Sequence, residues 1–275
     1  MSAKEVIKAV ILARGLGTRM RRIQDDMERL DPRQARMADS GLKAMIPVGR
    51  PFLDYVLSGL ADAGYREVCL VIGPEHGVVR EYYDRTCVPT RLKVSFAIQD
   101  QPLGTANALA AAEAFAAGDS FLMLNSDNYY PISACRELRL LAQPAIAAFE
   151  RHCLALDGNI SADRIRQFAV VTANPDGTLA RIIEKPDETT LRQLASDVFV
   201  SMNCWCFGPL IFQACAAIGP SPRGELELTD AVQFAISRLN ERFQVLTFHA
   251  GVLDLSSRSD IAAVAEKLKG IEVHL

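Results

Sequence analysis

A glycine-rich loop near the start of the sequence is the first place where the residue types could do chemistry. Residues 10–20 read VILARGLGTRM, an apolar run followed by Gly15, Gly17, Thr18 and Arg19. Glycines after a strand let backbone N–H groups surround an anion, and an arginine adds a charge-assisted contact. The spacing matches neither the Walker loop nor the dinucleotide fingerprint GxGxxG. The loop therefore predicts a phosphate site, with an ordinary tight turn as the alternative.

Two aspartates also follow apolar runs. Asp127 comes after SFLMLNS, and Asp254 comes after GVL. A carboxylate at the carboxyl end of a strand can hold Mg²⁺, while the alternative for each aspartate is a cap on a turn. Two such carboxylates at one edge of a sheet would make a metal site.

Other polar residues stand where elements are expected to begin or end. Lys43 precedes an apolar run and could face a phosphate, although a solvated surface lysine is the alternative. Gln99 leads into a Gly-Thr turn that opens a helix, and Glu184 and Lys185 end a hairpin strand. The four histidines have no ligand spacing, and no Ser/His/Asp or Cys/His constellation suggests a covalent nucleophile.

Strand-like and helix-like segments alternate along the chain and would position these residues. Strands are expected at 8–13, 67–72, 93–98, 120–125, 168–183 (as a hairpin), 197–207 and 243–251. Helices are expected at 51–64, 75–84, 105–118, 226–240 and 257–270. The βαβα rhythm predicts an α/β fold, a Rossmann-like three-layer α/β/α arrangement with a mostly parallel sheet. Ligands in such folds bind at the carboxyl ends of the strands.

Length and composition limit the protein classes. The 275 residues favour a single domain, 1–275, with halves at about 1–130 and 131–275. A net charge of -3 argues against a general nucleic-acid partner, and no apolar stretch is long enough to cross a membrane. The start MSAKEVIKAV lacks the form of a signal peptide, and the seven scattered cysteines suggest reduced core residues. We therefore expect a cytoplasmic protein, whose assembly into a homo-oligomer the sequence leaves open.

Taken in order, these segments resemble those of the sugar-1-phosphate nucleotidylyltransferases. The family opens with L-A-x-G-x-G-T-R-[LM], matched by residues 12–20, and its other short motifs follow along nearly the whole chain. These are K-x-[LM]-x-P-[VI] at 43–48, Q-x-x-x-x-G-T-A at 99–106, E-K-P at 184–186 and E-[LI]-T-D at 227–230. Asp127, Asn203 and Asp254 stand at further family positions. The joint order makes the resemblance specific, although each motif alone is short.

The resemblance implies that a sugar 1-phosphate attacks the α-phosphorus of an NTP and that pyrophosphate leaves. Positioning and electrostatics would carry such a reaction. Arg19 and Lys43 would hold the triphosphate, Asp127 and Asp254 would bind Mg²⁺, and Lys185 would hold the sugar phosphate, so that the residues implied as catalytic are Arg19, Lys43, Asp127 and Lys185. The implied nucleotide contacts are Leu12, Ala13, Gly15, Gly17, Thr18, Arg19, Gln99, Gly104 and Thr105. The implied sugar-phosphate contacts are Ala169, Glu184, Lys185 and Asn203.

The nucleotide and the acceptor are less sharply defined. UTP or dTTP is expected, because the shorter uridylyl and thymidylyl members of the family lack a β-helix appendage, as this chain does. One alternative is a cytidylyltransferase that uses a non-sugar phosphate acceptor, against which the E-K-P motif argues. The other is a catalytically silent relative that senses nucleotide sugars, which the unusual residues Arg14, Ser126, Ala169 and Ser256 would suit.

The largest departure from the family is an insertion at residues 21–42. The family has few residues between the loop arginine and the lysine, whereas 23 residues separate Arg19 from Lys43 here. The insertion is rich in charges of both signs and begins beside the expected triphosphate. It is interpreted as a partly helical lid over the nucleotide, with a solvated surface excursion as the alternative.

Overall fold

Short apolar strands alternate with helices through the first half of the chain. The structure, a computed structural model, describes residues 5–22, 30–194 and 199–275. The strands of this half are β1 (Lys8–Leu12), β2 (Glu67–Ile72), β3 (Lys93–Ile98), β4 (Phe121–Asn125) and β5 (Asn128–Tyr129). The helices are α1 (Thr18–Arg21), α2 (Pro32–Ser40), η1 (Lys43–Met45), α3 (Phe52–Ala63), α4 (Gly77–Glu81), η2 (Tyr82–Thr86), α5 (Thr105–Ala110) and α6 (Glu113–Ala116).

The second half mixes antiparallel strands with helices. Its strands are β6 (Ala145–Glu150), β7 (Ala169–Ala173), β8 (Leu179–Ile183), β9 (Phe199–Phe207), β10 (Gln244–Phe248) and β11 (Leu253–Asp254). Its helices are α7 (Ile132–Leu141), α8 (Arg151–Leu156), α9 (Ala162–Ile165), α10 (Glu188–Gln193), α11 (Leu210–Ala217), α12 (Leu228–Leu239) and α13 (Asp260–Leu268).

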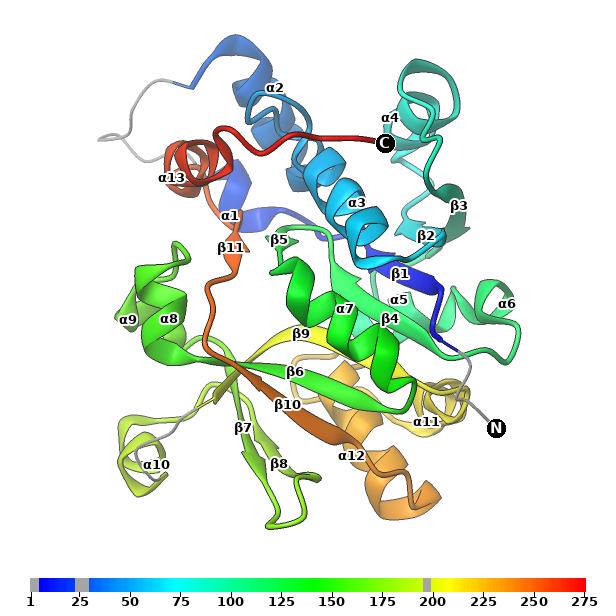
Figure 1. Cartoon of the computed structure of the whole chain (residues 1–275), viewed down its shortest axis with the longest axis vertical. Coiled ribbons are helices and arrows are strands. Elements are labelled where there is room, and N and C mark those ends of the chain that lie inside the picture. The colour runs from blue at the N-terminus through cyan, green and yellow to red at the C-terminus, as the bar shows by residue number, and fades with distance from the viewer. Residues whose placement is uncertain (1–4, 23–29, 195–198) are drawn as a thin grey trace.

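One sheet takes strands from both halves, in the order β10-β6-β9-β4-β1-β2-β3 (Figure 1). β1 pairs in parallel with β2 and with β4, as β2 does with β3 and β6 with β10. β9 runs antiparallel between β4 and β6, and the β7–β8 hairpin joins β9 outside this path. The loops that follow β1, β2 and β4 therefore lie at the same edge of the sheet.

Helices cover both faces of the sheet, because successive residues of a buried strand point to opposite sides. Val10 and Leu12 of β1 belong to the apolar cluster that includes α5, α11 and α12. Ala9 and Ile11 belong to the cluster that includes α3 and α7. The predicted three-layer α/β fold with a mostly parallel sheet is thus confirmed.

Some elements differ from those expected. The helix predicted over 105–118 is two shorter helices, α5 and α6, separated at 111–112. Nor were β6, α7, α8, α9 and α11 predicted. The reason for β6 is that AIAAFE is Ala-rich and buried along most of its length. A fully buried strand of this kind shows no alternation that would separate it from a helix. Residues 197 and 198, the start of one predicted strand, lie outside the described residues.

The 21–42 insertion contains the helix α2. Asp31 caps α2, accepting from the backbone N–H of Gln34 at 2.9 Å, while the side chain of Gln34 accepts from the N–H of Asp31 in a capping box. Residues 23–29 of the insertion lie outside the described residues, so the lid stays a prediction. In the described part of the chain, no helix is both long and apolar enough to cross a membrane.

Candidate active site

A cavity of about 470 Å³ opens where β1 and β4 end. The loops that follow these parallel strands meet there, as expected for a ligand site in an α/β sheet. Eleven of the residues expected in the site line it: Leu12, Ala13, Gly15, Gly17, Thr18, Arg19, Lys43, Gln99, Gly104, Thr105 and Asp127. The departures Arg14 and Ser126, together with Ser256, line it as well.

The glycine loop is shaped by two close approaches of the backbone. The N–H of Ala13 donates to the carbonyl of Val71 at 2.8 Å, which carries the sheet pairing one residue past β1. Gly17 has φ of +61°, and a Cβ there would lie 2.5 Å from the Cα of Gly41. Gly15 faces open space, since no atom lies within 4 Å of a Cβ built on it. The loop therefore leaves room for a ligand on one side and packs against the insertion on the other.

Lys43 and Asp127 form an ion pair inside the cavity. The Nζ of Lys43 donates to Oδ2 of Asp127 at 2.5 Å, and each side chain is about a fifth exposed, at 18% and 20%. Burial acts to lower the pKa of Lys43, but the charge and hydrogen bond of Asp127, and the charge of Asp254, raise it above its ordinary value. Lys43 is thus a permanent cation at a place where phosphate groups could replace its carboxylate partner.

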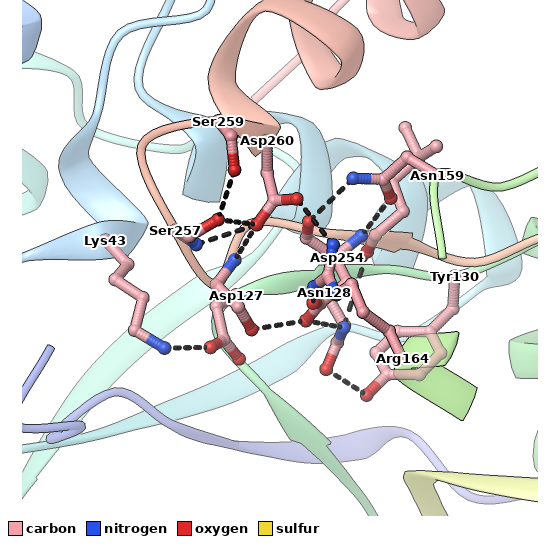
Figure 2. A network of polar contacts seen from close by, with 12 residues as sticks. Lys43, Asp127, Asn128, Tyr130, Asn159, Arg164, Asp254, Ser257, Ser259 and Asp260 are labelled. Carbon is pink, nitrogen blue, oxygen red and sulfur yellow. Dashed lines mark hydrogen bonds and ion pairs between the residues drawn. The ribbon is translucent and has the colours of Figure 1, made fainter. Parts of the chain in front are cut away.

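Asp254 lies behind this pair, at the centre of a buried polar network (Figure 2). Its Oδ1 accepts from the Nδ2 of Asn128 at 3.0 Å and from the hydroxyl of Ser256 at 2.9 Å, while its Oδ2 is paired with Arg164. Burial, and then the nearby charge of Asp127, raise the pKa of Asp254 to about 6, although Arg164 acts to lower it. The charge of Asp127 thus acts on Asp254, so the two carboxylates lie in one electrostatic environment.

The donor chemistry of Asp127 and Asp254 fits a divalent cation. Two carboxylates whose charges raise the pKa of one of them are the kind of pair that Mg²⁺ stabilises. Asp127 lines the cavity, whereas Asp254 is 2% exposed and does not. Binding through Asp254 therefore requires that Arg164 release Oδ2. The family pattern gave no reason to expect this arginine.

Gln99 is held so that one side of its amide is fixed. Its Nε2 donates to the carbonyl of Gly104 at 3.1 Å and to Oδ1 of Asn107 at 2.8 Å. A backbone carbonyl can only accept, so the amide nitrogen must lie on this side. Gln99 lines the cavity. Within the described residues its Oε1 accepts no hydrogen bond, and this atom is not fully buried. Oε1 is therefore available to a ligand.

The unusual Arg14 reinforces the same wall. Its guanidinium donates to the backbone carbonyl of Gln99 and pairs with Glu75 at 3.2 Å. Its side chain is 8% exposed, so it is a packed part of the cavity rather than a surface residue. Arg14 thus helps to hold the backbone of Gln99 in position.

Gly104 and Thr105 also have a structural task. A Cβ on Gly104 would lie 2.5 Å from the carbonyl oxygen of Leu226, and φ is +117°. The hydroxyl of Thr105 accepts from the N–H of Leu228 at 2.9 Å. These contacts tie the start of α5 to the start of α12, so that the E-L-T-D segment helps to position the turn that borders the cavity.

The expected sugar-phosphate residues gather at one end of β7, β8 and β9, outside the first cavity. Val170 pairs with Ile183 and Ala169 with Ser201, which brings Ala169, Glu184 and Asn203 toward one another. Asn203 has φ of +55° at a bulge of β9, and Lys185 has φ of +43° just after β8. Strained positive-φ residues of this kind cluster at functional sites.

Glu184 does not line the first cavity. It borders a separate cavity of about 240 Å³ together with Arg181, Thr229 and Asp230. The lining of the first cavity thus includes the nucleotide candidates but none of the sugar-phosphate candidates Ala169, Glu184, Lys185 and Asn203. The assigned roles remain predictions.

Several residues of the site were not predicted from the sequence. Asn128, Asn159 and Arg164 hold Asp254, and Asn107 holds Gln99. Asn107 stands eight residues after Gln99 and directly follows the motif at 99–106. Arg164 lies in a four-residue helix 90 positions from Asp254, and no local pattern marks it.

Comparisons with known proteins agree with this geometry. A family model described as "Nucleotidyl transferase" matches residues 8–269. The UTP–glucose-1-phosphate uridylyltransferase AglF of Haloferax volcanii is 26% identical over 264 residues, which cover 96% of this chain and 97% of AglF. A glucose-1-phosphate thymidylyltransferase of Streptomyces griseus is 32% identical over 238 residues, or 84% of this chain and 57% of that protein.

Other relatives are longer than this chain, and solved structures share its fold. The low-salt glycan biosynthesis nucleotidyltransferase Agl11 of H. volcanii is 27% identical over 82% of this chain, which spans only 56% of Agl11. A UDP-glucose pyrophosphorylase complexed with UDP-glucose superimposes with a TM-score of 0.73 at 18% identity, covering 95% of this chain and 97% of that one. The UTP-bound UGPase of Acinetobacter baumannii gives 0.73 at 19% identity, covering 98% and 95%. At these identities the structural matches show the fold alone.

Proposed function

The chain belongs to the nucleotidyl transferase family, and on this premise we propose that it transfers a nucleoside monophosphate from UTP or dTTP to a sugar 1-phosphate. A phosphate oxygen of the sugar 1-phosphate attacks the α-phosphorus, the bond to the β-phosphate breaks, and pyrophosphate leaves with its electron pair. The observation that carries the proposal is the single cavity that gathers the glycine loop, Arg19, Lys43, Gln99 and Asp127. AglF, which this chain matches over nearly its full length, is named as a uridylyltransferase acting with glucose 1-phosphate.

The residues of the cavity meet the needs of such a transfer. The glycine loop brings backbone N–H groups to the triphosphate, while Arg19 and Lys43 offset the charge that builds on the leaving pyrophosphate. Lys43 is already a cation and exchanges Asp127 for phosphate oxygens when the nucleotide binds. Asp127, with Asp254 once Arg164 withdraws, would hold Mg²⁺, which would offset phosphate charge if bound.

The acceptor would lie toward β7, β8 and β9. Lys185 carries the charge expected to meet the sugar phosphate, and Glu184 and Asn203 offer groups for sugar hydroxyls. The Glu184-Lys185-Pro186 segment favours a sugar phosphate over the alcohol phosphate of a cytidylyltransferase. A cytoplasmic location agrees with the expected supply of NTP.

One observation favours the second candidate, a silent nucleotide-sugar sensor. Both metal-type carboxylates have cationic side chains as partners, Asp127 with Lys43 and Asp254 with Arg164. A sensor would keep these pairs when it binds nucleotide, whereas an active transferase must open them.

A pyrophosphate-release assay decides between the two candidates. The purified protein is given each NTP with Mg²⁺ and a panel of sugar 1-phosphates, and thermal shifts are recorded for the same mixtures. Release that requires NTP, sugar 1-phosphate and Mg²⁺ together supports the transferase. Stabilisation by nucleotide or nucleotide sugar without release across the panel would point to the sensor instead.

A further inference from the structure

A second cavity, of about 260 Å³, lies beside the first and shares Arg19 and Ser256 with it. Four arginines line it, Arg19, Arg22, Arg164 and Arg258, and the rest of its wall is Gln167 and serines of the loop before α13. Among the described residues, no acidic side chain lines the cavity. Nothing in the transfer reaction described above uses Arg22, Arg258 or Gln167.

Two of the four arginines are fixed in place by carboxylates behind them. Arg164 pairs with Asp254 and, at 2.5 Å, with Asp260. Arg258 pairs with Asp39 of α2 and donates to the carbonyl of Met20 at 2.9 Å. These contacts set the position of the guanidinium groups before any ligand arrives, which reduces the cost of ordering them on binding.

The other two arginines provide the charge that is left over. Within the part of the chain that the structure describes, neither Arg19 nor Arg22 has an ion-pair or hydrogen-bond partner for its side chain. Counted over the described residues, the four arginines outnumber the three carboxylates paired with them, Asp39, Asp254 and Asp260, so this lining carries an excess of positive charge.

The cavity walls come from three separate parts of the sequence. Arg22 follows α1, Arg164 belongs to α9, and Arg258 stands in the loop before α13. Guanidinium groups that converge from different elements differ from a charged helix face, which spreads its charges into solvent. Planar guanidinium groups recognise phosphate oxygens through pairs of N–H donors.

We infer that this cavity is an accessory phosphate site that adjoins the transfer site through Arg19. Its ligand is a phosphate group, either on the pyrophosphate end of the nucleotide or on an acceptor that carries a second phosphate. The first source approaches from the shared Arg19, and the second from Gln167, which directly precedes Phe168 and Ala169. The assignment of these two sources rests on the proposed function, whereas the affinity of the cavity for phosphate does not.

Calorimetric titration of the full-length protein tests the inference with four probes. These are inorganic pyrophosphate, UMP, glucose 1-phosphate and glucose 1,6-bisphosphate. Arg22→Ala removes a cation from the cavity lining, and Gln167→Glu adds an anion to it. Both positions are exposed, so the variants are expected to fold. Arg36→Ala, which removes an exposed arginine of α2 that does not line the cavity, is the matched control.

We expect both variants to bind pyrophosphate about 5- to 10-fold more weakly, the size of a lost charge-assisted hydrogen bond. UMP, which has no β- or γ-phosphate, should bind all four proteins equally. If the loss appears with glucose 1,6-bisphosphate and not with glucose 1-phosphate, the same cavity takes the second phosphate of the acceptor. Unchanged affinity for both pyrophosphate and the bisphosphate, or an equal loss for UMP, overturns the inference.

Turnover keeps the inference separate from the proposed function. If no NTP and sugar phosphate react but pyrophosphate binding still depends on Arg22, the proposed function fails and the phosphate site stands. If pyrophosphate release is normal and binding ignores Arg22, the reverse holds.

Discussion

The pairing of Lys43 with Asp127 is the residue-scale feature on which the proposed transfer most directly depends. The Nζ of Lys43 lies 2.5 Å from Oδ2 of Asp127, and both side chains are partly exposed in the cavity that the glycine loop also lines. Each has the charge that a triphosphate or a metal ion would seek. The pair therefore keeps both charges compensated until substrate separates them.

Substituting Asp127 tests this assignment. Asp127→Asn keeps the size of the side chain and removes the charge, so kcat should fall by about 10²- to 10³-fold, as when one preorganised electrostatic group is lost from an active site. The measurement is pyrophosphate release under saturating substrates, with the unfolding midpoint as a check on the fold. Asp62→Asn, which removes a carboxylate paired with Arg91 on the surface, is the control and should retain full activity. A near-normal rate in Asp127→Asn would reduce Asp127 to a turn cap.

Asn107 provides a second residue-scale prediction, about base choice. It accepts from the amide nitrogen of Gln99, so in the proposed function Oε1 of Gln99 would accept a hydrogen bond from the base. Uracil and thymine offer an N3–H there, whereas N3 of cytosine carries no hydrogen. Asn107→Leu should lower the ratio of kcat/KM for UTP over CTP by about 5-fold or more, since an unmatched buried polar group costs about 1–3 kcal/mol.

The conservative variant separates positioning from general damage. Asn107→Asp keeps an acceptor for Nε2 of Gln99 and should preserve the UTP preference. If Asn107→Leu and Asn107→Asp lower both rates without changing their ratio, Asn107 supports the fold rather than base selection.

His76, in the loop after β2, is expected to make the stability of the protein depend on pH. Burial lowers its pKa below the ordinary 6.5, and the charges of Arg14 and Arg21 act in the same direction, while Glu75 opposes them. The unfolded chain therefore binds a proton on this group more readily than the folded one. By linkage, stability is full above pH 6.5 and is lost as the pH falls toward the folded-state pKa.

Denaturation from pH 8 to pH 5 measures this effect. At pH values below 6.5, the urea concentration at the unfolding midpoint should decrease in the wild type and decrease less in His76→Asn. The amide oxygen of the introduced asparagine can replace the ring nitrogen that accepts from the N–H of Gly73. His274→Asn, at an exposed position near the C-terminus, should leave the profile of the wild type unchanged. Identical profiles for His76→Asn and the wild type would refute the contribution of His76.

At the scale of elements, the sequence predicted which segments form the strands beside the site, but it did not predict the order in which the strands pair. The runs ending at Leu12 and Asn125 were recognised because apolar strands are followed by loops rich in glycine or polar residues. The hairpin of β7 and β8 was recognised from its Asn-Pro-Asp-Gly turn. The sequence could not show that β9 inserts antiparallel between β4 and β6, because strand order depends on pairing between distant residues.

The same division holds for the candidate site. Gly15 and Gly17, which would act through the backbone, were predicted from local spacing, and Gln99 was implied by the family resemblance; all three line the cavity. Residues that act through a distant contact were not predicted, and Arg164 with Asp254 is the clearest example. A guanidinium that reaches a carboxylate 90 positions away leaves no periodic trace in the sequence.

Contact between the glycine loop and the insertion yields an element-scale prediction. Gly41 ends α2 with φ of +77°, and a Cβ there would lie 2.7 Å from Nε of Arg21 and 2.9 Å from the carbonyl oxygen of Leu16. Gly41→Ala should therefore both destabilise the protein, by about 2–4 kcal/mol, and raise the KM for NTP by displacing the loop.

A glycine elsewhere separates backbone strain from this contact. Gly270 has φ of +83°, and a Cβ added there would have no atom within 4 Å. Gly270→Ala should cost only about 1–2 kcal/mol and leave the KM unchanged. If the two variants lose the same stability and both keep their KM, the packing of α2 does not shape the phosphate loop.

For the whole molecule, β9 is the strand on which the two halves meet. It pairs with β4 from the first half and β6 from the second, and it carries Trp205, which is fully buried. Trp205 stacks on Phe207 at 5.4 Å and meets Phe243 edge-on at 5.8 Å. Fluorescence from this single tryptophan therefore reports on the junction of the halves.

Unfolding should consequently occur as one transition, which tests the expectation of a single domain. Tryptophan fluorescence and far-UV circular dichroism, followed in urea, should give the same midpoint and slope. Trp205→Phe removes the fluorescence probe. It should lower the urea midpoint followed by circular dichroism and the thermal midpoint measured by calorimetry. Two separated transitions in the wild type would mean that the halves fold independently.

The central place of β9 also has a consequence for synthesis on the ribosome. β4 is complete at residue 125, but its partner along one edge is not finished until residue 207 has been translated. Through that interval residues 121–123 of β4 lack their β9 partners, which leaves unpaired N–H and C=O groups along that edge of a nascent chain. Translational pausing between these two points would lengthen the exposure, and chaperone dependence of the yield should be greatest for chains stalled there.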